Sequence, residues 1–375
     1  VLFGIQPEYE LRVGPMTPET FSSELPDNCY TLLCNDVSTS IPQLSDLQAR
    51  FQFIPNWRMD DVMISYAAQG GGVGPHVDNY DVFLLQGRGK RKWAVSTSPI
   101  PPDQEEIVEG IDVRVLKGPF TKDAEWVLEP GDMLYVPARF AHWGVSMDDE
   151  CMTYSIGFRA PNLQDIASEY ANHMCDNQNP DLFYTDPSSF RSQQGDAGLI
   201  NEQAVKRMWS DVAHTMLGCA LDTPPPPHFT RWLGGYLTQN LQRASSLHHS
   251  ARSCDAEEAE MIMADLAEGR ELSLTRSEGT KVAWLRLANG LAVCADGQVW
   301  ELDASAPDSL RGLQEGAAVL CGCHILTAER LNPLLSTSSP FRSIVQDWIV
   351  KGVVYCPSED DDDEDEQSMW DEQRM

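Results

Sequence analysis

Short apolar runs alternate with turns rich in glycine and proline over the central part of the chain, residues 51–159. Each run is only a few residues long, which is typical of strands rather than of helices. The clearest runs are residues 62–69, 82–86, 90–96 and 133–136. Because successive runs are joined by turns, the pattern predicts an antiparallel β-sandwich or β-barrel.

Helical periodicity replaces this pattern after residue 162. Four prolines at 224–227 separate two of the helical runs, because proline interrupts a helix. The expected helices are residues 163–174, 201–217 and 229–247. We therefore expect a helical region over residues 162–254, after a β unit over residues 1–161.

A third unit is expected over residues 255–357. The turns Asn289-Gly290 and Asp296-Gly297 predict a meander of three short strands. These strands are residues 282–287, 291–295 and 298–302. Helices expected at 256–268, 309–315 and 340–351 surround the meander, and this arrangement suggests a winged-helix-like α+β module.

The charge of the chain is strongly negative. Its 57 acidic residues against 27 basic ones leave a formal charge of -30. Such a surface is unsuited to neutralising phosphates, so we expect no direct nucleic-acid binding and favour a basic protein partner. Residues 257–356 carry 14 acidic and 8 basic residues, a net charge of -6, so the third unit fits protein contacts better than DNA. The acidic tail, residues 358–375, is expected to be disordered and solvated.

The spacing of the cysteines and the hydropathy of the chain indicate the cellular compartment in which the protein is expected. The ten cysteines show no paired spacing, which favours a reducing environment, and Cys321 and Cys323 are interpreted as buried thiols because no second ligand pair accompanies them. No stretch is long and apolar enough to cross a bilayer. We expect a soluble intracellular protein, with the cytoplasm favoured. Since the chain begins at Val1, an organelle or the nucleus stays open.

A candidate metal site combines two distant segments. His76 and Asp78 follow the glycine-rich run 70–74, and in extended backbone residues two apart point to the same side. His142 lies 66 residues further on, after the turn 130–132 and the strand 133–136, and we expect it to open the next strand. Two imidazoles and one carboxylate leave coordination positions open, which suits iron(II) with an oxo-acid and dioxygen. A hydrogen-bonded surface pair is the alternative for His76 and Asp78.

A candidate anion site lies on the run 90–96. Alternation places Arg91 on the same side as Trp93 and Val95, away from the neighbouring lysines. A guanidinium among apolar neighbours needs an anion, and the distal carboxylate of 2-oxoglutarate matches its planar fork. A structural ion pair with a buried Asp or Glu is the alternative. Ser65 and Thr153 are candidate hydroxyl partners of the same ligand, and each could equally be a satisfied core hydroxyl.

Several longer motifs resemble those of the Jumonji C ribosomal oxygenases, especially the bacterial-type ribosomal protein arginine hydroxylases. The resemblance covers residues 51–357. The motifs that carry it are residues 53–61, 70–76 with Asp78, 80–83 with Gln86-Gly87, 130–132 and 157–161.

The resemblance implies a double-stranded β-helix of the cupin (jelly-roll) kind, a helical dimerisation region and a C-terminal winged-helix domain. It also implies Fe(2+) held by His76, Asp78 and His142, 2-oxoglutarate bound by Arg91, dioxygen as oxidant, and a homodimer. The expected reaction is hydroxylation of a ribosomal protein side chain, with arginine favoured and histidine possible. Thr153 stands where the arginine-directed members carry asparagine, and the catalytic domain is expected to be truncated at its N-terminus.

Two other functions remain open at this stage. A histone lysine demethylase of the Jumonji C class would use the same centre, because a hydroxylated N-methyl group is lost as formaldehyde. A non-catalytic scaffold that binds through its winged-helix unit belongs to a different class. A gain of one oxygen in a peptide assay separates the hydroxylase from the demethylase.

Overall fold

The computed structural model describes residues 2–5, 8–111, 113–178, 205–208, 210, 225, 227–239, 252–268, 270, 272–304, 307–335 and 339–357. The predicted acidic tail, and most of the predicted helix 201–217, lie outside these residues. The part of the predicted helix 229–247 after residue 239 also lies outside them. None of the helices in the described ranges is long and apolar enough to span a membrane.

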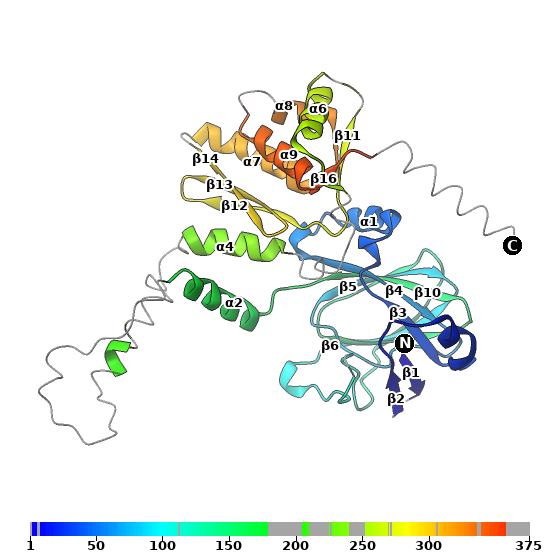
Figure 1. Cartoon of the computed structure of the whole chain (residues 1–375). Coiled ribbons are helices and arrows are strands. Elements are labelled where there is room, and N and C mark those ends of the chain that lie inside the picture. Colours follow the sequence, from blue (N-terminus) through cyan, green and yellow to red (C-terminus); the bar gives the residue numbers. More distant parts are fainter. Residues whose placement is uncertain are drawn as a thin grey trace, which may run out of the picture.

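Two antiparallel sheets form the first half of the molecule (Figure 1). The larger one has seven strands in the order β2-β1-β3-β4-β10-β5-β8. These strands are β2 (Glu8–Leu11), β1 (Leu2–Ile5), β3 (Tyr30–Cys34), β4 (Met59–Ala67), β10 (Cys151–Phe158), β5 (Asp81–Arg88) and β8 (Met133–Val136). The smaller sheet has the order β7-β6-β9, with β7 (Ala124–Leu128), β6 (Arg91–Pro99) and β9 (Phe140–Ser146). The predicted antiparallel strands are confirmed, and β9 begins two residues before His142 rather than at it.

The core between the two sheets comes from alternating residues on both. Val82 and Leu84 of β5 pack with Trp93 of β6, Leu128 of β7 and Val136 of β8. Burying such side chains is the main favourable term in folding, at about 25 cal/mol per Å² of apolar surface. On its other side the larger sheet packs on a second cluster, to which the helix α1 (Pro42–Ala49) contributes.

Short helical turns connect and flank the sheets. They are the π-helical turn η1 (Thr20–Glu24) and the 3-10 turns η2 (Val37–Thr39), η3 (Asn56–Arg58) and η4 (Pro102–Gln104). After β10 the chain forms α2 (Leu163–Asp176), capped by the side chain of Asn162, which accepts a hydrogen bond from the Gln164 N–H. The helix α4 (Pro227–Thr238) lies beside α2, and Tyr170 and Trp232 are in ring contact between them.

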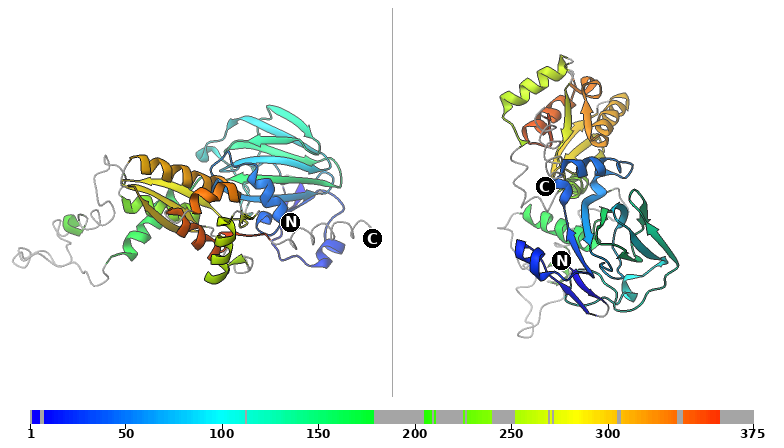
Figure 2. Two further views of the ribbon diagram at one scale, coloured as in Figure 1. Left: turned by 90° about the horizontal axis from the view of Figure 1, so that it is seen from above. Right: turned by 90° about the vertical axis from the view of Figure 1, so that its right-hand side faces the viewer.

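The C-terminal part is an α+β unit with its own core (Figure 2). The predicted meander is present as β12 (Val282–Leu287), β13 (Gly290–Ala295) and β14 (Gln298–Asp303). A second small sheet has the order β15-β11-β16, with β15 (Ile325–Thr327), β11 (Ser273–Arg276) and β16 (Val354–Tyr355). The helices are α6 (Ala256–Ala267), α7 (Pro307–Gly322), α8 (Ala328–Leu335) and α9 (Phe341–Val350). The assignment of this unit as winged-helix-like, and the predicted domain boundaries, stay predictions.

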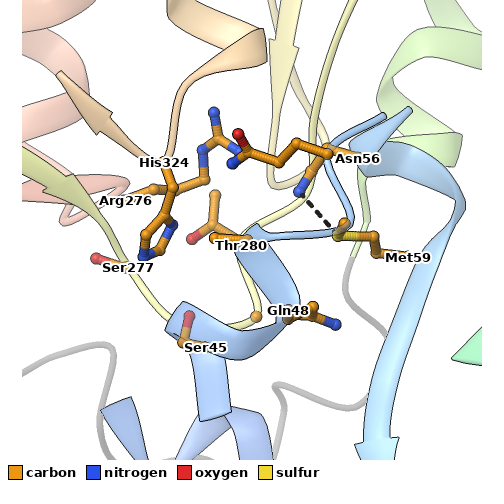
Figure 3. Close-up of a pocket in the computed structure, with 11 residues that line it drawn as sticks. Ser45, Gln48, Asn56, Met59, Arg276, Ser277, Thr280 and His324 are labelled. Atoms are coloured by element: carbon orange, nitrogen blue, oxygen red, sulfur yellow. Dashed lines mark hydrogen bonds between the residues drawn. The ribbon is translucent and has the colours of Figure 1, made fainter. Parts of the chain in front are cut away.

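The C-terminal unit contacts the β unit through α1 and η3. A small pocket of about 20 Å³ lies at this contact, lined by Ser45, Gln48 and Asn56 on one side and by Arg276, Thr280 and His324 on the other (Figure 3). Buried Arg276 donates to the carbonyl oxygens of Leu320, Cys321 and Cys323 at the end of α7. The side-chain oxygen of Asn56 accepts a hydrogen bond from the Val282 N–H at 2.7 Å, which fixes the start of β12 against the β unit.

Candidate metal centre and co-substrate pocket

The glycine-rich loop runs alongside β9 and delivers His76 to it. Gly70 N–H donates to the carbonyl of Ser146, and Ser146 N–H donates to the carbonyl of Gly71. A Cβ on Gly72 would lie 2.2 Å from the carbonyl oxygen of Gly144, so only glycine allows this approach. Gly74 has a positive φ of 93°, which L side chains rarely adopt. The loop glycines thus fix the backbone path to the first candidate ligand.

The three candidate metal ligands converge as predicted. Their ligand atoms all lie within 4.8 Å of one another, and Nε2 of His142 is 3.6 Å from Oδ2 of Asp78. Nδ1 of His76 lies 2.9 Å from the Gly74 carbonyl, and Nδ1 of His142 lies 3.0 Å from the Phe140 carbonyl. Because a carbonyl only accepts, each Nδ1 holds the proton and each Nε2 keeps its lone pair for a metal.

Burial sets the protonation state of His142. His142 is almost inaccessible to solvent. Burial, reinforced by the neighbouring His76, lowers the pKa of His142 to about 4. Its imidazole is therefore neutral at physiological pH, which is the form that binds a metal.

No second cluster of this kind occurs among the described residues. Cys321 and Cys323 are free thiols, and burial raises the pKa of the Cys321 thiol to about 12, which makes it a poor metal ligand. His173, His228 and His324 join no ligand group within the described ranges. His214, His248 and His249 lie outside the described residues.

Arg91 is buried and its guanidinium is only partly satisfied. Along β6, Arg91 and Trp93 are buried whereas Lys92 is exposed, as the alternation predicts. Nη1 donates to Oγ of Ser65 at 3.1 Å, and Nε donates to Sγ of Cys151 at 3.2 Å. Nη2 is buried and finds no hydrogen-bond partner in the described part of the chain. No carboxylate within those residues forms an ion pair with Arg91, so the alternative of a structural ion pair has no support there.

Ser65 and Thr153 differ in their surroundings. They face each other across β4 and β10. Ser65 lines the same cavity as the candidate metal ligands. The hydroxyl of Thr153 donates instead to Oε1 of the buried Gln86 at 3.0 Å, and Thr153 does not line that cavity. Contact between Thr153 and an oxo-acid stays a prediction, and the structure gives this hydroxyl another partner.

One cavity of about 720 Å³ joins the candidate metal ligands, Arg91 and Ser65. Trp93 also lines this cavity, whereas Trp126 and Trp143 do not. Polar and aromatic side chains from several elements also line this cavity, and we call this set the rim. The rim residues include Trp57, Asp60, Asp61, Tyr80, Arg159, Asp165, Tyr236, Gln239 and Lys281.

The charges on this rim are close together. Nε of Arg159 is 2.6 Å from Oδ2 of Asp60, and the Arg159 guanidinium also lies over the ring of Tyr80. Burial raises the pKa of the Asp60 carboxyl and lowers the pKa of the Lys281 amine. Sequence reasoning missed these residues. The Asp60-Asp61 pair next to a strand was a usable signal, but Lys281 reaches the rim from the C-terminal unit, which no local pattern shows.

Paired antiparallel sheets that enclose two histidines, one carboxylate and a partly unsatisfied arginine define a cupin-type, metal-dependent oxygenase. The JmjC domain model matches residues 46–166. A protein of Haemophilus influenzae named probable ribosomal oxygenase is 32% identical over 326 residues, which are 83% of this chain and 74% of that protein. The chain belongs to the JmjC ribosomal oxygenases, as the sequence motifs predicted, and the members of this family are 2-oxoglutarate-dependent oxygenases.

Two further relatives agree with this assignment. The ribosomal protein uL16 3-hydroxylase of Escherichia coli is 32% identical over 234 residues, which are 62% of this chain and 58% of that protein's own length. The solved structure of YcfD, a ribosomal oxygenase from E. coli in complex with cobalt and 2-oxoglutarate, is 27% identical, with a TM-score of 0.66. That match covers 95% of this chain and 86% of the other. The expected cupin-like β fold is thereby confirmed.

Proposed function

We propose that this chain hydroxylates a side chain of a ribosomal protein, with arginine as the favoured residue and histidine as the alternative. Fe(2+) would be held by His76, Asp78 and His142. When bound, ferrous iron and 2-oxoglutarate supply the oxidising chemistry that places one atom of dioxygen on a carbon of the substrate, with succinate and carbon dioxide as co-products.

The observation that carries this proposal is that Nη2 of Arg91 has no hydrogen-bond partner among the described residues. Arg91 lines a cavity that the three candidate ligands also line, and a buried guanidinium nitrogen without a partner is costly. A carboxylate of 2-oxoglutarate would satisfy it, while Ser65 and Cys151 hold the rest of the guanidinium in place. The donor set of two neutral imidazoles and one carboxylate suits a divalent metal with open positions.

The protein's own contribution is binding, orientation and exclusion of water. Arg91 and His142 are buried, so the inner end of the cavity is shielded from bulk solvent. Electrostatic interactions there are stronger than in water. The backbone hydrogen bonds to each Nδ1 orient the imidazoles before any ligand arrives.

The rim supports a cationic substrate side chain. Asp61 and Asp165 line the cavity, and carboxylates suit a guanidinium. The ring of Tyr80, which lines the same cavity, already carries the guanidinium of Arg159. The formal charge of -30 favours the approach of a basic protein, as most ribosomal proteins must be to bind RNA phosphates. The name of the E. coli relative, a uL16 3-hydroxylase, places the activity of that relative on a ribosomal protein.

The assembly and the compartment belong to the same proposal. We infer a homodimer through the helical region, a C-terminal winged-helix-like module that makes protein contacts rather than nucleic-acid contacts, and a cytoplasmic location. These inferences follow from the family resemblance and the charge of the chain.

The test is a mass measurement on ribosomal proteins from cells that lack this enzyme. The full chain is incubated with these proteins, Fe(2+) and 2-oxoglutarate, and tandem mass spectrometry locates any gain. We expect one added oxygen on one protein, at an arginine, and none with the Asp78→Ala variant. Oxygen added to a histidine would reassign the residue, loss of a methyl group would indicate a demethylase, and no turnover of 2-oxoglutarate would overturn the proposal.

A further inference from the structure

The connection between β6 and β7, residues 100–123, packs against the segments that carry the candidate metal ligands. We call this connection the wall. Val115 pairs with His76 as an isolated β-bridge, and the Leu116 N–H donates to the Pro75 carbonyl at 2.8 Å. A small apolar cluster fills the space between this connection and the ligand segments. It contains Val77, Leu116 and Ala141, with Ile100 and Phe120 packed against them. The connection is therefore joined to both ligand segments by backbone pairing and by packing.

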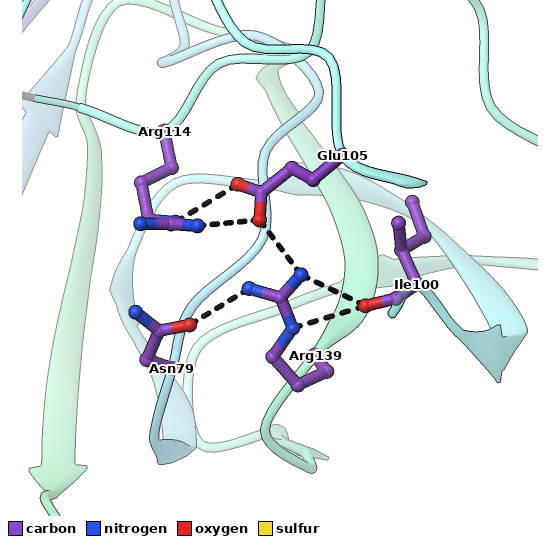
Figure 4. A network of polar contacts seen from close by, with 5 residues as sticks. All are labelled: Asn79, Ile100, Glu105, Arg114 and Arg139. Atoms are coloured by element: carbon purple, nitrogen blue, oxygen red, sulfur yellow. Dashed lines mark hydrogen bonds and ion pairs between the residues drawn. The ribbon is translucent and has the colours of Figure 1, made fainter. Parts of the chain in front are cut away.

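A buried carboxylate lies at the centre of this wall. The side chain of Glu105 is only 2% exposed, yet two guanidinium groups converge on it (Figure 4). Arg114 contacts both carboxylate oxygens, with Nε 2.9 Å from Oε1, and Nη2 of Arg139 is 2.7 Å from Oε2. Burial alone would raise the pKa of Glu105, but the hydrogen bonds from the two arginines hold it below its usual value. The carboxylate is thus ionised and fixed.

Arg139 ties this carboxylate to the ligand segments. Its backbone N–H donates to the carbonyl of Asp78 at 2.8 Å, and its Nη1 donates to the side-chain oxygen of Asn79 at 2.7 Å. Nε and Nη2 both donate to the carbonyl of Ile100, at 3.0 and 2.8 Å. Arg139 also lies three residues before His142. One side chain therefore links the segment after Asp78, the start of β9 and the wall.

The backbone of Arg139 has an unusual conformation. Its φ is 72°, in the left-handed region that L side chains rarely adopt. Such a residue persists where its surroundings determine its position from several sides, and it often accompanies a functional site. The hydrogen bonds of Arg139 supply that determination here.

We propose that Glu105 and Arg139 are positioning residues for the metal, an inference that rests on the proposed function. They hold the Asp78 carboxylate at the distance from His142 at which one ion can contact both. Neither residue lines the cavity of the candidate site. The effect of the two side chains passes through the Asn79 side chain and through the short segment from Arg139 to His142. The backbone N–H of Arg139, which binds the Asp78 carbonyl, is held in place by these side-chain contacts. Groups that orient metal ligands in this way commonly change metal affinity 10- to 100-fold when they are lost.

The test uses Co(2+) binding to the full chain, without any turnover. Glu105→Gln preserves the shape of the side chain and removes its charge. Arg139→Lys preserves the charge but replaces the planar fork, whose separate nitrogens reach Asn79, Ile100 and Glu105, with one compact ammonium group. Glu109→Gln is the matched control, because Glu109 lies in the same connection in an exposed pair with Lys117. We measure Co(2+) affinity, the visible absorption spectrum of the Co(2+)-loaded protein, and the thermal midpoint of the metal-free protein.

We expect Co(2+) affinity to fall about 10- to 100-fold in both variants, with an altered absorption spectrum. The thermal midpoint of the metal-free variants should fall, because a buried ion pair is disturbed, but both should stay folded at the temperature of the titration. The Glu109→Gln control should match the wild type throughout. Unchanged affinity and spectrum in both variants would overturn the inference, as would a loss of affinity only in variants that have already unfolded. A wild-type chain that binds Co(2+) but oxidises no substrate would refute the proposed function and leave this inference standing.

Discussion

His76 and His142 exchange two backbone hydrogen bonds, each with an N···O distance of 3.0 Å, although 66 positions separate them in the chain. Residues that pair directly in antiparallel strands project their side chains to the same face. Their rings therefore lie side by side, with centroids 4.1 Å apart. The two candidate imidazole ligands are thus set side by side by backbone pairing between the glycine loop and β9.

Replacing Asp78 with alanine should abolish stable metal binding. The two imidazoles would remain, but the only carboxylate of the candidate ligand cluster would be lost. We expect the affinity for Co(2+) or Fe(2+) to fall by more than the roughly 10–100-fold typical of an outer-shell change. Isothermal titration calorimetry on the metal-free protein measures this. Asp103→Ala, an exposed carboxylate on the same unit, is the control, and equal metal affinities in both variants would exclude Asp78 as a ligand.

Replacing Arg91 with lysine should weaken 2-oxoglutarate binding at least about tenfold. An ammonium group cannot reproduce the planar fork of the guanidinium, and each charge-assisted hydrogen bond is worth about 1.5–3 kcal/mol. The measurement is the concentration of 2-oxoglutarate that half-saturates the metal-loaded protein. Lys92→Met is the control, since Lys92 lies next in the same strand but pairs with Glu125 on the exposed side. Unaltered affinity in Arg91→Lys would argue that the co-substrate binds elsewhere.

Replacing Gly72 with alanine should push the glycine-rich loop, residues 70–74, away from β9. The added Cβ would meet the Gly144 carbonyl at 2.2 Å, and backbone atoms cannot move aside cheaply. We expect Gly72→Ala to destabilise the chain by about 1–3 kcal/mol and to weaken metal binding, because the loop leads directly to His76. Thermal unfolding and metal titration test both effects. Gly118→Ala, where the Cβ would meet nothing within 4 Å, should leave both properties unchanged.

Acid should destabilise the contact between the β unit and the C-terminal unit through His324. Burial lowers the pKa of His324 from 6.5 to about 4, so the folded state keeps the imidazole neutral while the unfolded chain binds a proton more readily. The contribution of His324 is present above pH 6.5 and is lost as the pH falls toward 4. Acidification should lower the free energy of unfolding of the wild type by on the order of 1–3 kcal/mol through His324, and we expect His324→Gln to remove this loss. The free energy of unfolding is measured at several pH values for the wild type and for His324→Gln. If it changed equally with pH in both proteins, His324 would not be the group responsible.

Local patterns predicted the inner part of the site. Alternation along β6 placed Arg91 inward, and the two-residue spacing of His76 and Asp78 placed both near one point. These relations depend only on the periodicity of extended backbone. The exact start of β9 was not predictable in this way, because it follows from the left-handed conformation of Arg139 and its tertiary hydrogen bonds.

The outer part of the site and much of the C-terminal unit depend on packing between distant segments. Tyr236 and Lys281 reach the cavity rim from α4 and from the residue before β12, and no sequence window contains both of them and the metal ligands. The strands β11, β15 and β16 were not predicted, because they are short and pair with segments far away in the chain rather than across a turn. The partner of Arg91 at Nε, Cys151, likewise becomes visible only through the register of β10 against β4 and β5.

The helix α4 faces two ways. Its glycines Gly234 and Gly235 lie so close to the meander that a Cβ would meet Leu285 and the backbone of Gly297, while the next residue, Tyr236, lines the cavity. A chain cut after residue 161 would keep every candidate ligand but would lose the part of the cavity lining that α4 provides. The cavity would then lose its lining from Tyr236 and Lys281, so the C-terminal half helps to enclose the candidate site even though none of its described residues belongs to the candidate ligand group.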